Sequence, residues 1–272
     1  MTDNHADTTS SLLNFGEELI HTELLGSNDL PWLVMCHGLG LSSKDLRPIA
    51  TDLAKDWHVL LWDMPGHGES QPGPKDYHPA KMARILEFVI IRYGVIDPVL
   101  LGFSFGGVVS QYFIRDHPEF VRAFIAYACF APFSQPRTNA YWLAQIAQII
   151  LYFRSWRAIC DNFAEQCAIT PAAQEQVRIE VLRLKKKEFI RMAGAVYSAF
   201  DYDPNFKLTM PTLLVRGQLD SSSLILDQAN IALTRVAQKI AQETVHGAGH
   251  CSHLDQPNRF LSAIKPFLSS VC

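Results

Sequence analysis

Short, uninterrupted runs of apolar residues recur along the chain, and many of their members are β-branched. They lie at 32–36, 58–62, 98–103, 123–128 and 211–215, with a weaker run at 240–245. None of them shows the polar alternation of a half-exposed strand, a pattern typical of strands that are covered on both faces. We therefore expect these runs to form buried β-strands.

Segments with helical spacing of apolar residues separate most of these runs. They lie at 46–54, 79–93, 108–117 and 225–236. An alternation of strands and helices favours a mostly parallel sheet joined by right-handed crossovers. The predicted fold class is α/β, with a mostly parallel central sheet flanked by helices.

The alternation stops after the strand at 123–128. The segments 141–153, 156–167 and 171–200 have helical patterns with no strand between them. We interpret residues 133–205 as a helical cap inserted into a core formed by residues 1–132 and 206–272.

Composition narrows the class of protein. A chain of 272 residues, 48% hydrophobic, is long enough for one domain with a large core. A formal net charge of −3 provides no basic field for nucleic acid. No apolar stretch is long enough to span a membrane.

Cysteine usage and the N-terminus indicate the compartment. Six cysteines without a C-x-x-C pair favour buried thiols over disulfides, and the first twelve residues contain no Lys or Arg and lack the pattern of a secretory signal. We expect a cytoplasmic protein with a frayed N-terminus.

A candidate nucleophile follows the strand at 98–103. Gly102-Phe103-Ser104-Phe105-Gly106 is a G-x-S-x-G sequence placed between an apolar strand and a helical segment. A turn this tight strains the serine backbone and exposes its hydroxyl, and glycines let the strand and helix approach. The N-terminus of the following helix directs the N–H of Phe105 toward a developing oxyanion.

With these residues the chain resembles the α/β-hydrolase superfamily, from about Phe15 to Phe267. The elbow G-F-S-F-G-G is similar to that of small esterases, lactonases and cofactor-free haloperoxidase-like proteins, and Ser104 in place of aspartate argues against haloalkane dehalogenases. The resemblance implies that His37-Gly38-Leu39-Gly40 is the oxyanion loop, with the Leu39 N–H as second donor. It also matches Asp63–Ser70 to a family turn, to which we assign a structural role. His37 could itself act as a base, but we interpret it as a residue whose hydrogen bonds tie down the loop.

A serine nucleophile requires a histidine base held in one tautomer by an acid. The fold's chain order of Ser, acid and His assigns Asp220, after the strand at 211–215, and His250 in His246-Gly247-Ala248-Gly249-His250. Asp220 could instead cap a helix, with Asp227 as the reserve acid. His246 and His253 are interpreted as loop packing or pocket lining, Cys251 as an inert buried thiol, and the glycines argue against a zinc site.

The predicted function is a serine hydrolase that cleaves small to medium apolar carboxylic esters or lactones through an acyl-enzyme, with no cofactor or metal. Its partner is a small molecule with an apolar acyl or ring moiety. The alternatives are a non-hydrolytic enzyme of this fold (hydroxynitrile lyase or haloperoxidase-like), a carbon–carbon bond hydrolase, or a ligand receptor that retains the triad. Aromatic residues in and before the cap are candidates for substrate binding, although each could instead pack the cap onto the sheet: Phe130, Phe133, Tyr141, Trp142 and Trp156.

Overall fold

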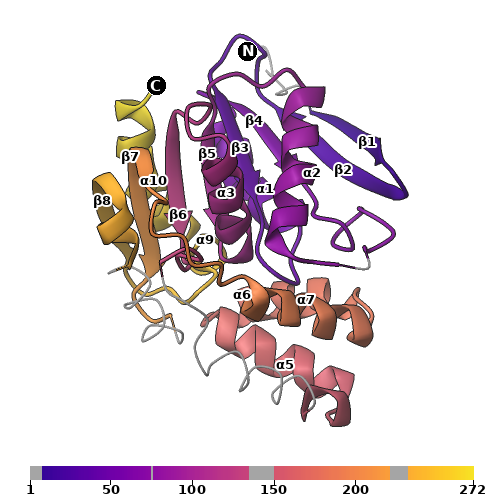
Figure 1. Cartoon of the computed structure of the whole chain (residues 1–272). Helices are drawn as coiled ribbons and strands as arrows, with labels where there is room; N and C mark the ends of the chain where they lie inside the picture. Colours follow the sequence, from indigo (N-terminus) through magenta and orange to yellow (C-terminus); the bar gives the residue numbers. More distant parts are fainter. Residues whose placement is uncertain (1–7, 75, 135–149, 221–231) are drawn as a thin grey trace, which may run out of the picture.

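The computed structural model describes residues 8–74, 76–134, 150–220 and 232–272. Within them an eight-stranded sheet runs through the molecule in the order β1-β2-β4-β3-β5-β6-β7-β8 (Figure 1). The strands are β1 Thr9–Phe15, β2 Glu18–Leu25, β3 Trp32–Cys36, β4 His58–Trp62, β5 Val99–Phe103, β6 Ala123–Tyr127, β7 Leu208–Gly217 and β8 Ala237–Val245.

The sheet is parallel from β4 to β8 and antiparallel only where β1 pairs with β2 and β2 with β4. The predicted fold class is therefore confirmed, and a strand is present at every predicted run. All carboxyl ends of the parallel strands lie at one edge, which is where loops that carry chemistry converge in such sheets.

Helices cover both faces of the sheet (Figure 1). Side chains of α1 and α10 pack with one hydrophobic cluster, and those of α2 and α3 with another on the opposite face. The core helices are α1 Ser43–Leu53, α2 Pro79–Arg92, α3 Phe105–Asp116, α9 Ser252–Asp255 and α10 Pro257–Ser270.

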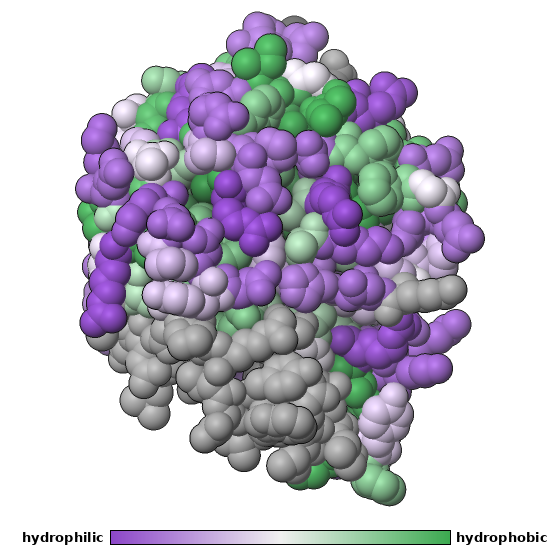
Figure 2. All heavy atoms as spheres, viewed as in Figure 1, coloured by the Kyte–Doolittle hydropathy of each residue, from purple (hydrophilic) through white to green (hydrophobic). Residues whose placement is uncertain are grey.

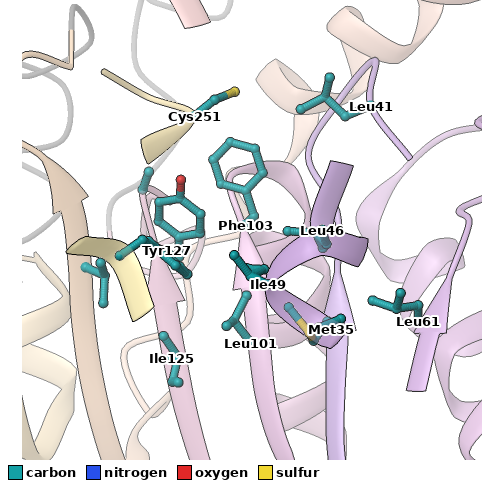
Figure 3. Close-up of a cluster of buried hydrophobic side chains, with 14 of the residues drawn as sticks. Met35, Leu41, Leu46, Ile49, Leu61, Leu101, Phe103, Ile125, Tyr127 and Cys251 are labelled. Carbon is teal, nitrogen blue, oxygen red and sulfur yellow. The ribbon is translucent and has the colours of Figure 1, made fainter. Parts of the chain in front are cut away.

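The two clusters explain why the strand sequences are continuously apolar. Along β5, Leu101 and Phe103 join the cluster with α1, whereas Leu100 joins the cluster with α3. Successive residues of a strand point to opposite faces, so a strand between two helical layers needs an apolar residue at every position. Figure 3 shows part of the first cluster, with Phe103 and Tyr127 side by side at the ends of their strands.

The N-terminal hairpin was not predicted, and the expectation of a frayed N-terminus is wrong from Thr9 onward. β1 pairs with β2 in register from Thr9↔Leu24 to Phe15↔Glu18. Its sequence, TSSLLNF, is mostly exposed or half-buried and gives little apolar signal. This edge strand is specified by pairing with β2, a tertiary interaction that overrides local propensity.

In the described part of the chain between β6 and β7, the helices are α5 Trp156–Cys167, α6 Pro171–Leu182 and α7 Lys186–Ser198, which we call the cap helices. The predicted helix at 156–167 is found with those bounds, while the segment at 171–200 is divided in two. Lys185 leaves helical geometry with φ −78° and ψ 135°, which starts α7 in a new direction. Most of the predicted helices at 141–153 and 225–236 lies outside the described residues, and the parts that are described, 150–153 and 232–236, are helical.

The surface of the described part is mixed. On the face in Figure 2, hydrophilic side chains predominate and hydrophobic ones are scattered among them, as is normal for a protein surface. None of the helices in the described ranges has both the length and the apolar character needed to cross a bilayer.

A buried carboxylate fastens the start of α1 to the sheet. Asp63 follows β4 and is 1% exposed. One of its oxygens accepts the N–H of Ser43 at 2.6 Å, and the other accepts the N–H of Glu69 at 2.9 Å and lies 3.0 Å from His21 Nδ1. Burial alone would raise the pKa of Asp63, but these hydrogen-bond donors and nearby His37 hold it well below its ordinary range.

Replacing this carboxylate should weaken the fold. We expect Asp63→Asn to lower the free energy of unfolding by about 3 kcal/mol, because the buried His21 loses its charge partner and the amide cannot accept every N–H. The depressed pKa means that the stabilisation is present at neutral pH and is lost on acidification below about pH 4. Urea unfolding at pH 7 measures the effect, with Glu119→Gln, a change at an exposed glutamate, as the matched control.

Candidate active site

Ser104 sits at a sharp turn between β5 and α3. Its backbone has φ 52° and ψ −116°, in the left-handed half of conformational space that a residue with a side chain rarely adopts. Its N–H donates to the carbonyl of Tyr127 at 2.8 Å, which ties the turn to the end of β6. The predicted strain at the elbow is therefore present.

Glycines make this turn possible. A Cβ at Gly106 would lie 2.4 Å from the carbonyl oxygens of Cys36 and His37, and one at Gly102 would lie 2.5 Å from the Cα of Gly107. Such distances are shorter than real Cβ contacts, so only glycine lets α3 approach β5 and β3 this closely. The close approach brings the loop after β3 over the serine.

The turns after β7 and β8 lie against each other. The N–H groups of Gln218 and Leu219 donate to the carbonyls of Val245 and Ala248, at 3.0 and 2.8 Å. A Cβ at Gly217 would lie 2.0 Å from the carbonyl oxygen of Gly249. These contacts bring residues 220 and 250, far apart in the sequence, to one place.

The structure brings the three predicted polar side chains together. Ser104 Oγ lies 2.9 Å from His250 Nε2, and His250 Nδ1 lies 2.7 Å from Asp220 Oδ2. With Nδ1–H donating to the carboxylate, Nε2 is free to accept the serine proton. The reserve acid, Asp227, lies outside the described residues.

The environment of His250 tunes its basicity. Burial disfavours the charged ring, but the hydrogen bond and the negative charge of Asp220 outweigh burial and raise the pKa of His250 above its ordinary value. Asp220 is itself 3% exposed, so its charge is little screened by solvent. This arrangement favours a histidine that accepts a proton and holds it as an imidazolium.

The loop after β3 is fixed beside the serine. The His37 ring donates from Nδ1 to the Gly38 carbonyl at 2.8 Å and accepts the N–H of Met64 at Nε2 at 2.9 Å. Both ring nitrogens are occupied, so His37 ties down the loop. Leu39 lines the same cavity as Ser104, and Phe105 is the first residue of α3, where helix geometry leaves amide hydrogens without an internal acceptor.

Two residues that the sequence did not single out hold the His250 loop. The hydroxyl of Tyr127 donates to the His250 carbonyl at 3.1 Å and accepts the N–H of His253 at 3.1 Å. The Asp255 carboxylate accepts the N–H of Gly249 at 2.9 Å and the N–H of Thr170, in the cap, at 2.8 Å. In the sequence, Tyr127 is not distinguishable from the other residues of its apolar strand. The signal for Asp255 is limited to its place in a pattern of an acidic residue followed by proline.

The neighbouring histidines pack or lie in the loop, as predicted. His253 is buried against Phe103 and Phe260, with its Nδ1 2.9 Å from the Tyr127 hydroxyl. Burial and the nearby His250 lower the pKa of His253 to about 3. The exposed His246 uses its carbonyl to accept a hydrogen bond from Arg259. Across the described ranges, acidic, histidine and cysteine side chains form no cluster suited to a metal ion.

A cavity of about 110 Å³ opens beside Ser104. Its described walls come from the loop after β3, the elbow, the cap and the His250 loop, and they carry no charged carboxylate or guanidinium. The lining residues are Gly38, Leu39, Leu41, Phe103, Ser104, Phe163, Cys167, Val196 and His250.

The predicted substrate-binding aromatics do not line this cavity where they are described. Phe133 is 1% exposed and packs between Tyr112 and Phe206 on the opposite side of the sheet, so its assignment was wrong. Phe130 stacks on Phe200, with ring centroids 4.8 Å apart. Trp156 packs on Phe189 within the cap. Tyr141 and Trp142 lie outside the described residues.

Aromatic content alone does not distinguish a ring that lines a cavity from a ring that packs the cap. Phe163 lines the cavity from α5 and contacts Phe189 edge-on, with centroids 5.2 Å apart. Val196 lines it from α7. Their orientation depends on how the cap helices pack, which no local pattern specifies.

Comparisons with known proteins agree with this architecture. A family model described as "alpha/beta hydrolase fold" matches residues 31–148. A pimeloyl-[acyl-carrier protein] methyl ester esterase of Photorhabdus laumondii is 25% identical over 256 residues, 90% of this chain and 93% of that protein. A thermophilic esterase from Thermogutta terrifontis superimposes with a TM-score of 0.82 at 22% identity, covering 98% of this chain and 99% of that one.

A third relative matches over a shorter stretch. The 2-succinyl-6-hydroxy-2,4-cyclohexadiene-1-carboxylate synthase of Pectobacterium atrosepticum is 39% identical over 83 residues. The match spans 30% of this chain and 32% of that protein, about a third of its length.

The site predicts distinct titrations for the buried histidines. In proton or ¹⁵N NMR, His250 should titrate above about 6.5, whereas His253 should stay neutral between pH 5 and 9. In Asp220→Asn the favourable charge is lost while burial remains, so the pKa of His250 should fall below its wild-type value. A wild-type His250 that titrates below 6, or does not respond to Asp220→Asn, would contradict this electrostatic account.

Proposed function

Because the chain belongs, by its fold, to the α/β-hydrolase superfamily, we propose that it is a serine hydrolase of small to medium apolar carboxylic esters or lactones. Ser104 is the nucleophile, His250 the general base and acid, and Asp220 the residue that orients and stabilises the histidine. One observation carries the proposal: an unbroken hydrogen-bonded path from Ser104 Oγ through His250 to Asp220, with steps of 2.9 and 2.7 Å.

The first half-reaction acylates the serine. Ser104 Oγ attacks the substrate carbonyl carbon as its proton passes to His250 Nε2, and Asp220 stabilises the imidazolium. The negative charge that develops on the carbonyl oxygen is met by the N–H groups of Leu39 and Phe105. Losing one such fixed donor typically raises the barrier by about 3 kcal/mol. His250 then gives its proton to the departing alcohol.

The second half-reaction returns the free enzyme. With the alcohol gone, His250 Nε2 accepts a proton from water, and the hydroxide attacks the Ser104 ester. The same two N–H groups hold the second oxyanion. The proton passes back to Ser104 Oγ as the acid leaves, so the cycle consumes only water and needs no cofactor.

The cavity wall supports an apolar acyl group. Leu41, Phe163 and Val196 offer hydrocarbon, and a methylene that fits against such a surface contributes about 0.8 kcal/mol. A volume of about 110 Å³ accommodates a short chain. Leu41 comes from the core and the other two from the cap. Both parts therefore limit the length of the acyl chain that the cavity can hold.

A second candidate is a non-hydrolytic reaction at the same three residues. It is favoured by the name of the relative matched over 83 residues, which is a synthase and not a hydrolase. In that case His250 and Ser104 would move a proton on the substrate without an acyl-enzyme. Formation of a covalent Ser104 ester distinguishes the two candidates.

The nucleophile is tested by Ser104→Ala. Hydrolysis of an aryl acetate or butyrate should fall by at least about 10⁴-fold in kcat, as in other triads. A fluorophosphonate probe should label wild-type protein on the peptide that contains Ser104, and should leave the variant unlabelled. Ser262→Ala, a change at an exposed serine, is the matched control. Near-wild-type turnover in Ser104→Ala would rule out the mechanism.

The acyl pocket is tested by Phe163→Ala. In wild-type protein, kcat/KM for p-nitrophenyl esters should rise about fourfold per methylene until the pocket is full, and then fall. The variant should move the optimum to a longer chain, because the removed ring vacates wall volume. Phe153→Ala, at a cap residue that is 87% exposed, should leave the optimum unchanged. A chain-length profile that is flat in wild type, or identical in both variants, argues against this pocket.

A further inference from the structure

Two buried thiols meet where the cap touches the His250 loop. Cys167 is the last residue of α5 and Cys251 follows His250 directly. The N–H of Cys251 donates to the carbonyl of Cys167 at 2.7 Å, so the two residues are in direct contact. Bond lengths along the path through this single hydrogen bond keep the two Cα atoms within about 7 Å of each other, and a disulfide spans a Cα separation of about 4.4–6.8 Å.

The pair is open to small reagents from one side. Cys167 lines the cavity that contains Ser104, whereas Cys251 is 0% exposed and is not among the lining residues. Figure 3 shows the Cys251 sulfur pointing away from Tyr127. Cys160, on the same helix as Cys167, is 0% exposed and is not among the residues that line this cavity. The cavity, at about 110 Å³, has room for a molecule of the size of hydrogen peroxide.

The two thiols differ in acidity. The neighbouring Cys251 lowers the pKa of Cys167 despite its burial, and the charge of His250 adds to this. Burial raises the pKa of Cys251, and the neighbouring Cys167 raises it further. Cys167 is the sulfur that faces the cavity, and its lowered pKa favours it as the one that reacts first.

We propose that Cys167 and Cys251 are an oxidation site at which a peroxide forms a reversible disulfide, and that this bond lowers the activity of the neighbouring Ser104 and His250. The Cys167 thiolate attacks one oxygen of the peroxide, the O–O bond breaks, and a sulfenic acid and water result. The Cys251 sulfur then attacks the sulfenic sulfur, and a second water leaves. In total, two thiols lose two electrons and two protons, and one hydrogen peroxide becomes two waters.

The disulfide would displace His250 because His250 is joined to Cys251 by a peptide bond. A disulfide holds its sulfurs about 2.05 Å apart, closer than two thiols in van der Waals or hydrogen-bonded contact. Closing that gap moves Cys251 toward the cap, and His250 is its direct neighbour. Catalytic groups tolerate displacements of only about 0.5 Å, so the 2.9 Å contact between His250 and Ser104 would be disturbed. The effect on activity rests on the proposed function, whereas formation of the bond does not.

The test uses the full chain with Cys272→Ser, because Cys272 is exposed and could link two molecules. After treatment with hydrogen peroxide and blocking of free thiols, a non-reducing digest should contain a peptide linking Cys167 to Cys251, lighter by two hydrogens than the separate peptides. Ester hydrolysis should fall at least about tenfold and recover with dithiothreitol. Oxidised Cys167 without the linked peptide would overturn the proposal.

Two variants separate the pair from other thiols, each measured against its own reduced activity. Cys160→Ala, the matched control on α5, should keep both the linked peptide and the recoverable loss. Cys251→Ala should show no linked peptide and no dithiothreitol-recoverable loss, because a lone oxidised Cys167 proceeds to sulfinic acid. The same recoverable loss in Cys251→Ala, or a linked peptide with unchanged activity, would overturn control by the disulfide. If the chain hydrolyses no ester, the linked peptide alone still decides whether the oxidation site exists.

Discussion

The strained backbone of Ser104 is the constraint on which the rest of the site depends. A positive φ at a residue with a side chain costs about 1–3 kcal/mol, and it persists only where surrounding contacts enforce it. Here the hydrogen bond to the Tyr127 carbonyl and the glycines at 102 and 106 enforce it. The same glycines allow the loop after β3 to lie over the serine. Core packing between β5, β3 and α3 thus fixes both the hydroxyl and the amides beside it.

The histidine is held differently, between the core and the cap. Tyr127, at the end of β6, donates a hydrogen bond to the His250 carbonyl. Asp255 accepts hydrogen bonds from both Gly249, the residue before His250, and Thr170 in the cap. The hydrogen bond from the Cys251 N–H to the Cys167 carbonyl is a second contact between this loop and the cap. The serine depends on the core alone, whereas the histidine depends on both parts. A shift of the cap relative to the core therefore displaces His250 more directly than Ser104.

Sequence reasoning succeeded where a local pattern has one structural solution. Buried strands such as β5 need apolar residues on both faces. A serine flanked by glycines between a strand and a helix is typical of the tight turn found at Ser104, because a Cβ at either glycine would clash. It failed where several tertiary arrangements fit the same residues. β1 has little apolar signal of its own, and Phe133 and Phe163 are both cap-region phenylalanines that differ only in what they face. Tyr127 and Asp255 are recognisable only through partners distant in the sequence.

The cap is joined to the core by directional polar contacts as well as by apolar packing. Ser42 donates to Glu180 of α6 at 2.9 Å, and Gln176 donates to Asp45 at 3.2 Å. Burial, together with the nearby Glu180, raises the pKa of Asp45 to about 7. Apolar contact alone would let the cap helices slide over the sheet, but a buried hydrogen bond is lost after a shift of about 1 Å. These contacts fix the position of α6 on the core. They thereby also restrain the neighbouring helices α5 and α7, which carry Phe163 and Val196. The shape of the cavity beside Ser104 is therefore set where the cap helices meet the core, outside the three residues Ser104, His250 and Asp220.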